Sequence, residues 1–163
     1  MLRVRPHGSW RHGFDLLDES GAPVGSFEGS PWREGGRIRA GGQQREFRRE
    51  RSRRLVLAGP RGEDAAADRV SAWSGRWRLS AGGRTYELAK AAWYSRRYQL
   101  RAGDAVAGEL TPRGVFRSKA DVTLPPELPP AVQVFVVAVV MTLWRRDDAA
   151  AGGAAAAGVA TSS

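Results

Sequence analysis

The stretch "LPPELPPAVQVFVVAVVMTLWRR", residues 124–146, is the only long apolar run in this 163-residue chain, and it decides the fold. Residues 131–144 carry no charge; prolines precede them and two arginines follow. As a strand these fourteen residues would extend about 46 Å, far beyond the usual strand length. Pro130 suits the first turn of a helix, and Arg145 and Arg146 suit the negative end of a helix dipole. The run therefore predicts a helix.

This helix would be apolar on every face, so protein or lipid must surround it. At 1.5 Å per residue it would be about 21 Å long, short of the roughly 30 Å hydrocarbon core of a bilayer. The preceding prolines prevent the helix from extending backwards to a spanning length. We therefore interpret residues 131–146 as the core helix of a globular domain. An interfacial or anchoring segment is the alternative.

The chain before the helix reads as short extended runs, from Arg3 to about Val122, broken by glycine roughly every eight to twelve residues. This rhythm is typical of an antiparallel β-sandwich or β-barrel. Turn residues between apolar flanks predict hairpins at residues 14–29, 76–88 and 98–110, the last turning at Gly103-Asp104.

An internal repeat of about 40 residues supports this interpretation. "GRIR" at 36–39 matches "GRWR" at 75–78, and in each copy a Gly-Gly pair follows. "SRRLVLAG" at 52–59 then matches "SRRYQLRAG" at 95–103. Three copies at most are too few to close a propeller, so repeated hairpins in one sheet or barrel explain the repeat better.

A β-rich chain that ends in one helix, apolar all round, can bury both elements if the strands close around the helix. We therefore predict one mainly β domain over residues 1–147, a closed antiparallel β-barrel around a central hydrophobic C-terminal α-helix. The segment 148–163 is rich in alanine and glycine and uncharged after Asp148, which predicts a disordered tail.

The order of these features resembles the tubby C-terminal-like superfamily, which includes tubby proteins, phospholipid scramblases and LURP-one-related proteins. The resemblance rests on the pattern G-x-x-V-G-x-F at 21–27, a second such hairpin at 103–110, and the proline-flanked apolar helix. It covers residues 2–147 and implies a barrel of about twelve strands that binds phosphoinositide headgroups through basic side chains. The acidic pairs Glu63-Asp64 and Asp147-Asp148 do not make the oxygen-rich loop that a calcium-dependent scramblase needs.

Charge and composition indicate which kinds of partner the protein binds and in which cell compartment it is expected. The chain has 26 basic and 17 acidic residues, a formal charge of +9, which favours nucleic acid or an anionic lipid surface. Zero cysteines exclude disulfides and thiolate chemistry and fit a reducing cytoplasm. The first residues have no apolar segment of the kind a secretory signal requires. We expect a cytoplasmic protein, peripheral to the inner membrane surface where it contacts membrane at all.

Known catalytic patterns are absent from the sequence. The two histidines, His7 and His12, lie five apart beside Asp15, a spacing that fits no zinc signature. "GGRIRAGG" at 35–42 has neither the lysine nor the spacing of a phosphate-binding loop, and no Gly-x-Ser-x-Gly elbow occurs. The sequence predicts a non-catalytic protein without a metal or other cofactor.

The most basic segment is "REFRRERSRR" at 45–54, with six arginines and two glutamates. One interpretation is a solvated charged edge that prevents aggregation; the other is an anion-binding patch for anionic phospholipid or phosphoinositide. Strand parity would put Phe47 and Leu55 on the same face as Arg49 and Arg53, so either a bulge intervenes or the arginines project beyond the barrel. The candidate residues, with two more from the equivalent point of the repeat, are Arg45, Arg48, Arg49, Arg51, Arg53, Arg54, Arg96 and Arg97.

Six tryptophans raise a nucleic-acid alternative, since exposed aromatic rings stack on bases. Trp77 alternates with Leu79 in a strand pattern, and Trp144 ends the apolar helix, so we interpret most tryptophans as strand and core residues. Trp93-Tyr94, beside Arg96 and Arg97, is the cluster that base stacking would use. Nucleic-acid binding is the less favoured function.

Overall fold

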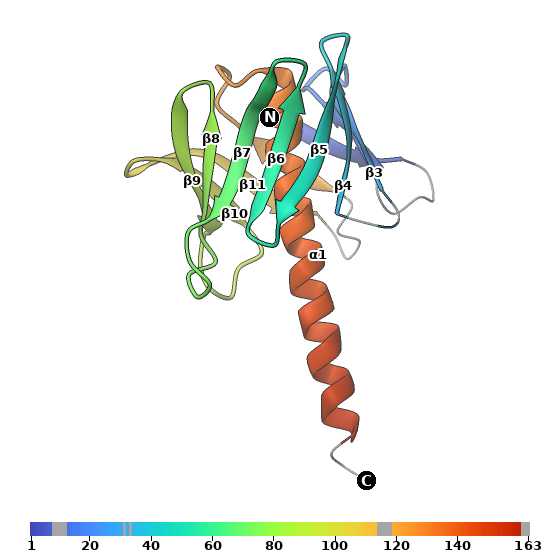
Figure 1. Ribbon diagram of the computed structural model, residues 1–163, viewed down its shortest axis with the longest axis vertical. Helices are drawn as coiled ribbons and strands as arrows, with labels where there is room; N and C mark the ends of the chain where they lie inside the picture. Colours follow the sequence, from blue (N-terminus) through green and yellow to red (C-terminus); the bar gives the residue numbers. More distant parts are fainter. Residues whose placement is uncertain (8–12, 31, 33, 114–118, 161–163) are drawn as a thin grey trace.

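The computed structural model describes residues 1–7, 13–30, 32, 34–113 and 119–160, with side chains as far as 154. The strands are β1 (Leu2–Pro6), β2 (Gly13–Leu17), β3 (Pro23–Gly29), β4 (Gly35–Ala40), β5 (Gln43–Arg51), β6 (Arg54–Gly59), β7 (Gly62–Arg69), β8 (Trp77–Ala81), β9 (Arg84–Lys90), β10 (Tyr98–Ala102), β11 (Ala105–Pro112) and β12 (Ala120–Thr123), followed by helix α1 (Pro130–Ala160). Within these residues, twelve antiparallel strands follow chain order around one closed barrel, and α1 runs through it (Figure 1). The strand β1 pairs with β12 to close the ring. The predicted fold class is confirmed.

The three predicted hairpins are β2–β3, β8–β9 and β10–β11. The repeat corresponds to β4–β6 and β8–β10, which have the same turn geometry. Gly41 and Gly42 have φ values of 58° and 72°, and Gly82 and Gly83 have 57° and 75°. Two successive residues with positive φ make the tight hairpin turn that matches strand twist, which is why each copy has a glycine pair there.

The interior of the barrel is filled by α1. Seven consecutive residues, 134–140, have no exposed surface, so the helix contacts protein on every side over almost two turns. Inward-facing strand residues such as Leu16, Ile38 and Leu88 belong to the same core. The core interpretation of residues 131–144 is confirmed. Across the residues described, no helix is both long and apolar enough to cross a membrane.

One glycine sets how closely the helix approaches the sheet. A Cβ placed on Gly25 would lie 2.8 Å from Cγ2 of Val134 and 2.8 Å from the carbonyl oxygen of Arg39. Any side chain at this position of β3 would therefore push α1 and β4 away. Gly25 belongs to the G-x-x-V-G-x-F pattern, so part of that pattern has a packing reason.

The end of the helix differs from our prediction. We expected the helix to stop at Arg146 and residues 148–163 to be disordered, but α1 continues to Ala160 and leaves the barrel as a projecting rod (Figure 1). Alanine has the highest helix propensity, and a helix already nucleated inside the barrel extends at little cost. Propensity, with no burial required, is sufficient to explain the extension. The rest of the predicted tail, 161–163, lies outside the described residues.

Substituting Val137 by Asp is expected to unfold the protein. The residue is fully buried in the helix, and an unpaired carboxylate there costs several kcal/mol, against a total stability of about 5–15 kcal/mol. Circular dichroism during urea unfolding gives the measurement. Val106→Asp is the matched control, because Val106 is 48% exposed and should tolerate the charge. Equal midpoints for the two variants would mean that the helix is not central to folding.

Candidate anion-binding surface

The barrel has two ends with different loops. We define the entry end as the end where α1 begins, with the turns 18–22, 41–42, 60–61, 82–83, 103–104 and 124–129. The exit end is where α1 leaves, with the loops 52–53, 70–76 and 91–97 and, from the other connections at this end, the described residues 7, 30, 32, 34, 113 and 119. Contacts with the last buried turn of α1 mark the exit end. The Nε1 of Trp144 donates a hydrogen bond to the carbonyl of Arg96 (2.8 Å), and Arg146 contacts the carbonyl of Ser52 (3.3 Å).

The predicted arginines fall into separate places. The β5–β6 hairpin carries Arg48 to Arg54 towards the exit end, and loop 91–97 brings Arg96 and Arg97 to the same end. Arg45 lies further back along β5, paired in register with Ile38. The parity conflict is resolved by a register shift between Arg49 and Arg51, so that Leu55 pairs with Arg49 and Arg54 pairs with Arg51. Of the two alternatives, the bulge is therefore present, and from Arg48 to Arg53 the side chains are exposed.

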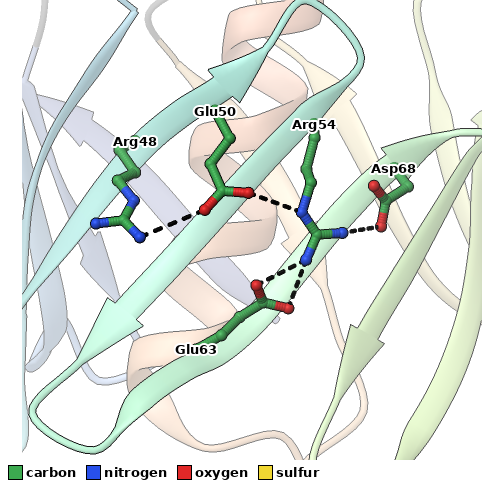
Figure 2. A network of polar contacts seen from close by, with 5 residues as sticks. All are labelled: Arg48, Glu50, Arg54, Glu63 and Asp68. Carbon is green, nitrogen blue, oxygen red and sulfur yellow. Dashed lines mark hydrogen bonds and ion pairs between the residues drawn. The ribbon is translucent and has the colours of Figure 1, made fainter.

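Arg54 is the centre of an ion-pair network on the outer face of the barrel. Figure 2 shows its guanidinium between Asp68 (2.6 Å), Glu63 (2.7 Å) and Glu50 (3.0 Å), and Glu50 also accepts a hydrogen bond from Arg48 (3.3 Å). The hydrogen bond to Asp68 and those to Glu63 and Glu50 raise the pKa of Arg54 above its ordinary value. Three carboxylates more than neutralise two guanidinium groups, so this cluster does not offer a free positive charge.

The network also covers an apolar patch. Val56 and Ala66 are buried but do not belong to the interior core, because they alternate with the inward-facing residues of β6 and β7. Val56 pairs in register with Arg48 and with Ala66 on the outer face. Long side chains such as arginine bury their aliphatic stems on apolar surface while the charged groups stay in water. Arg48 and Arg54 therefore have a structural use on this face.

A second network fixes the exit of the helix. Glu34 accepts hydrogen bonds from Arg146 at 2.7 Å and 2.5 Å and from Arg49 at 3.4 Å, and Arg146 also lies 5.6 Å from the ring centroid of Trp77. Hydrogen bonding by Arg146, together with the positive charges nearby, outweighs burial and lowers the pKa of Glu34. Helix, loop 30–34 and β5 are thus joined through one carboxylate.

Loop 91–97 is tied to the helix and to its neighbouring strand. Arg96 pairs with Asp148 at 3.3 Å, Arg97 pairs with Glu109 at 3.5 Å, and Lys90 pairs with Asp147 at 2.7 Å. These pairs are partly exposed and each contributes little stability alone, but together they position the loop beside α1. Asp147 and Asp148 therefore have cationic partners.

Six of the eight predicted arginines thus have carboxylate partners. Five have been described above, and the sixth, Arg45, pairs with Asp64 at 2.5 Å. Arg51 and Arg53, at the hairpin tip, are exposed and make no ion pair within the described residues. Arg76, in loop 70–76, is exposed and equally unpaired there, although the sequence did not single it out. These three arginines, like the exposed Lys119, are exit-end cations that can bind an external anion without breaking an ion pair of the described structure.

The core interpretation of the tryptophans is right for two of the described residues it covers and wrong for two. Trp77 and Trp144 are buried as expected, but Trp32 and Trp73 are 93% and 97% exposed. Trp93, which belongs to the stacking alternative, is 89% exposed. Trp10 lies outside the described residues. The exposed rings occupy exit-end loops, where no strand alternation places them inside. Their settings, "SAWSG" and "AAWYS", are small polar segments without apolar alternation, and this signal could have marked them as loop residues.

A cavity of about 470 Å³ lies between loops 70–76 and 91–97, beside the helix. Trp73 and Trp93 line it together with Arg69, Arg76 and Arg146. The Nε of Arg69 is buried without a hydrogen-bond partner among the described residues, while its Nη2 donates to the carbonyl of Ala72 (2.8 Å). The cavity therefore combines aromatic walls with an unsatisfied donor.

Comparisons with known proteins add no assignment: no protein-family model, curated protein or solved structure matches this chain.

Within the described residues, no group of three or more His, Cys, Asp or Glu side chains is arranged to hold a metal ion. His7 instead forms a 2.6 Å contact with Asp15, and His12 lies outside the described residues.

Replacing Glu34 by Gln is expected to lower the free energy of unfolding by about 1–3 kcal/mol at neutral pH, because hydrogen bonds to a charged group are lost. The folded-state pKa of Glu34 is lowered, so its stabilisation is fully present above the ordinary glutamate pKa. It is lost as pH falls through the folded-state pKa. Urea unfolding of both proteins between pH 7 and acid pH should show the difference shrinking.

Glu28→Gln is the matched control for that experiment. Glu28 is half exposed and its contact with Arg39 is 3.9 Å long, so its replacement should change stability much less. A Glu34→Gln effect no larger than that of Glu28→Gln, at every pH, would contradict a role for Glu34 in holding the helix exit.

Proposed function

We propose that this chain is a non-catalytic binding module that docks reversibly on anionic phospholipid surfaces, phosphoinositide-containing ones included, through the exit end of its barrel. The separation of charge between the two barrel ends carries the proposal. The described loop residues of the exit end include six cations, Arg53, Arg76, Arg96, Arg97, Arg113 and Lys119, against the single carboxylate of Glu34. Arg96, Arg97 and Arg113 pair with carboxylates of neighbouring elements, and Arg53, Arg76 and Lys119 make no ion pair in the described structure. The entry-end turns have four carboxylates, Asp18, Glu19, Asp104 and Glu127, against Arg61 alone. Such a dipolar barrel would approach an anionic surface with its exit end first.

The energy available is sufficient for reversible attachment. Each basic residue near an anionic leaflet contributes about 1 kcal/mol, and salt screens this attraction. Arg51, Arg53 and Arg76 have no carboxylate partner in the described structure, so binding a phosphate does not require them to break an ion pair. Arginine also holds a phosphate through two parallel hydrogen bonds, which suits a headgroup.

The aromatic-walled cavity is compatible with the same ligand chemistry. Arg69 and Arg76 both line it, so a phosphate group that enters the cavity would lie near two arginine side chains.

The proposed relationship to the tubby C-terminal-like superfamily favours a phosphoinositide among anionic lipids, because the resemblance implies headgroup binding through basic side chains. The cysteine-free composition supports a cytoplasmic location, facing the anionic inner leaflet.

The triple variant Arg51→Ser, Arg53→Ser, Arg76→Ser is expected to reduce partitioning onto anionic vesicles about 100-fold at low salt. Three basic residues contribute about 3 kcal/mol together, and 1.4 kcal/mol corresponds to a factor of ten. Sedimentation with vesicles of phosphatidylcholine plus phosphatidylserine or a phosphoinositide gives the measurement, against phosphatidylcholine alone.

The matched control removes the same charge elsewhere. Arg3, Arg61 and Arg101 lie outside the exit-end loops, and no ion pair of theirs occurs in the described structure. Their triple serine variant should retain most of the wild-type binding. If both triple variants lose binding equally, the attraction depends on net charge alone; if neither does, the exit-end arginines are only a solvated edge. Either result rejects docking through this end.

Nucleic acid is the second candidate, and the exposed Trp93–Tyr94 pair supports it. The two rings pack edge to face at 5.5 Å, are 89% and 76% exposed, and lie beside Arg96. Base stacking on such rings is worth about 1–3 kcal/mol per base and is accompanied by steep salt dependence.

Single-stranded oligonucleotides should then quench tryptophan emission at low salt, and Trp93→Leu should weaken binding about tenfold or more. Val106→Leu, on an exposed strand position away from the loops, is the control. No gel shift at low salt, where electrostatic binding is strongest, would eliminate this candidate.

A further inference from the structure

The exit end carries aromatic surface that nothing in the described structure covers. Trp73, Trp93 and Tyr94 are 97%, 89% and 76% exposed, and they occupy two neighbouring loops, 70–76 and 91–97. Trp73 and Trp93 line the same cavity, and Trp93 packs against Tyr94, so the three rings form one patch. Trp32, in loop 30–34, adds a third exposed indole at this end.

The entry end differs from the exit end in its aromatic content. Its turns, 18–22, 41–42, 60–61, 82–83, 103–104 and 124–129, contain no aromatic residue at all. Globular proteins bury most of the surface of their tryptophans, and an uncovered aromatic patch usually marks an interaction site. The chain therefore concentrates its uncovered aromatic surface and its excess positive charge at the same end.

Three properties of this end fit a bilayer interface. Indole and phenol rings have an apolar body and a polar group, and they concentrate where acyl chains meet headgroups. The unpaired Arg76 in the same loop as Trp73 would lie at the level of the anionic headgroups. The projecting part of α1 leaves the barrel at this end, and it carries no charge from Ala149 onward, so it can enter the same layer (Figure 1).

The length of the projecting part of α1 limits how deeply it can enter a bilayer. The twelve helical residues 149–160 extend about 18 Å, well short of the roughly 30 Å hydrocarbon core. The arrangement is therefore suited to penetration of one leaflet from one side.

We propose that loops 70–76 and 91–97 insert Trp73, Trp93 and Tyr94 into the interfacial layer of an anionic phospholipid bilayer. This inference rests on the proposed function and adds to it a second, salt-resistant component of attachment. The arginines bring the exit end to the surface, and the aromatic rings then hold it there by leaving water. Ionic strength weakens the first step and not the second.

The test uses the full chain and vesicles of phosphatidylcholine with about a third phosphatidylserine, a composition that gives a strongly anionic surface. Protein is bound at low salt, salt is raised, and the bound fraction is measured by sedimentation. The variant Trp73→Ser, Trp93→Ser, Tyr94→Ser should bind at low salt but lose about a hundredfold in partitioning at high salt, since burying each large aromatic side chain favours binding severalfold to over tenfold. The three side chains are exposed, so the urea midpoint should stay at the wild-type value.

Tryptophan emission provides an independent measurement. Insertion should shift the wild-type emission to shorter wavelength and make it sensitive to quenching by bromine-labelled acyl chains. Trp77 and Trp144 are buried in the barrel and provide a constant background. The Arg51→Ser, Arg53→Ser, Arg76→Ser variant retains all the rings, so it should show the same shift once enough vesicle is added to bind it.

The outcomes separate this inference from the proposed function. Binding that is fully reversed by salt, with no emission shift, would leave electrostatic docking intact and overturn insertion. Equal emission shifts with neutral and anionic vesicles would support insertion while refuting the preference for anionic lipid. Absence of binding to any vesicle overturns both, and quenching by oligonucleotides but not by brominated lipid would assign the patch to base stacking.

Discussion

Burial of a helix that is apolar on all sides is the constraint on which the rest of this structure depends. A helix with one apolar stripe can lie on a sheet, but residues 134–140 have no face that tolerates water. A sheet closed around the helix satisfies this requirement and at the same time removes its own open edges. The close approach of Val134 to Gly25 shows how tightly the two elements fit, because not even a methyl group can be added there without displacement.

Closure also determines where charge can go. With the interior filled by apolar side chains, the many arginines must lie on the outer face or at the ends. On the outer face they alternate with carboxylates across neighbouring strands, as in the register Arg54, Asp68, Arg78, Glu87, Arg101 around β6 to β10. Opposite charges at cross-strand positions stabilise a sheet, whereas like charges there would destabilise it. Much of the basic character of the sequence is therefore compensated locally, and Arg51, Arg53 and Arg76 are among the uncompensated cations, gathered at the exit end.

This distribution explains why the candidate site was only partly predictable. The basic segment 45–54 is conspicuous in the sequence, and its hairpin, its bulge and its position at the barrel end follow from turn signals and strand parity. That Glu63 and Asp68 neutralise Arg54 could not be predicted, because those residues come from the next strand and their pairing depends on register. Arg76 was overlooked for the opposite reason: it does not belong to a long basic run, and only the fold brings it and Trp93 of the loop 91–97 to one cavity. Trp32 and Trp73 were assigned to the core from their residue type, although the small residues around Trp73 indicated a loop.

The helix, the hairpins, the glycine-pair turns and the closed β-barrel class follow from the amino-acid sequence, because each depends on local periodicity, turn chemistry or the need to bury one apolar segment. The pairing of the arginines, the exposure of the aromatic rings and the grouping of loops at the end where α1 emerges follow only from the folded chain. Those properties depend on contacts between residues far apart in the chain, such as Glu34 with Arg146 and Arg96 with Asp148. The continuation of α1 to Ala160 is the intermediate case: alanine propensity was visible in the sequence, but a nucleus held inside the barrel was needed to make that propensity effective.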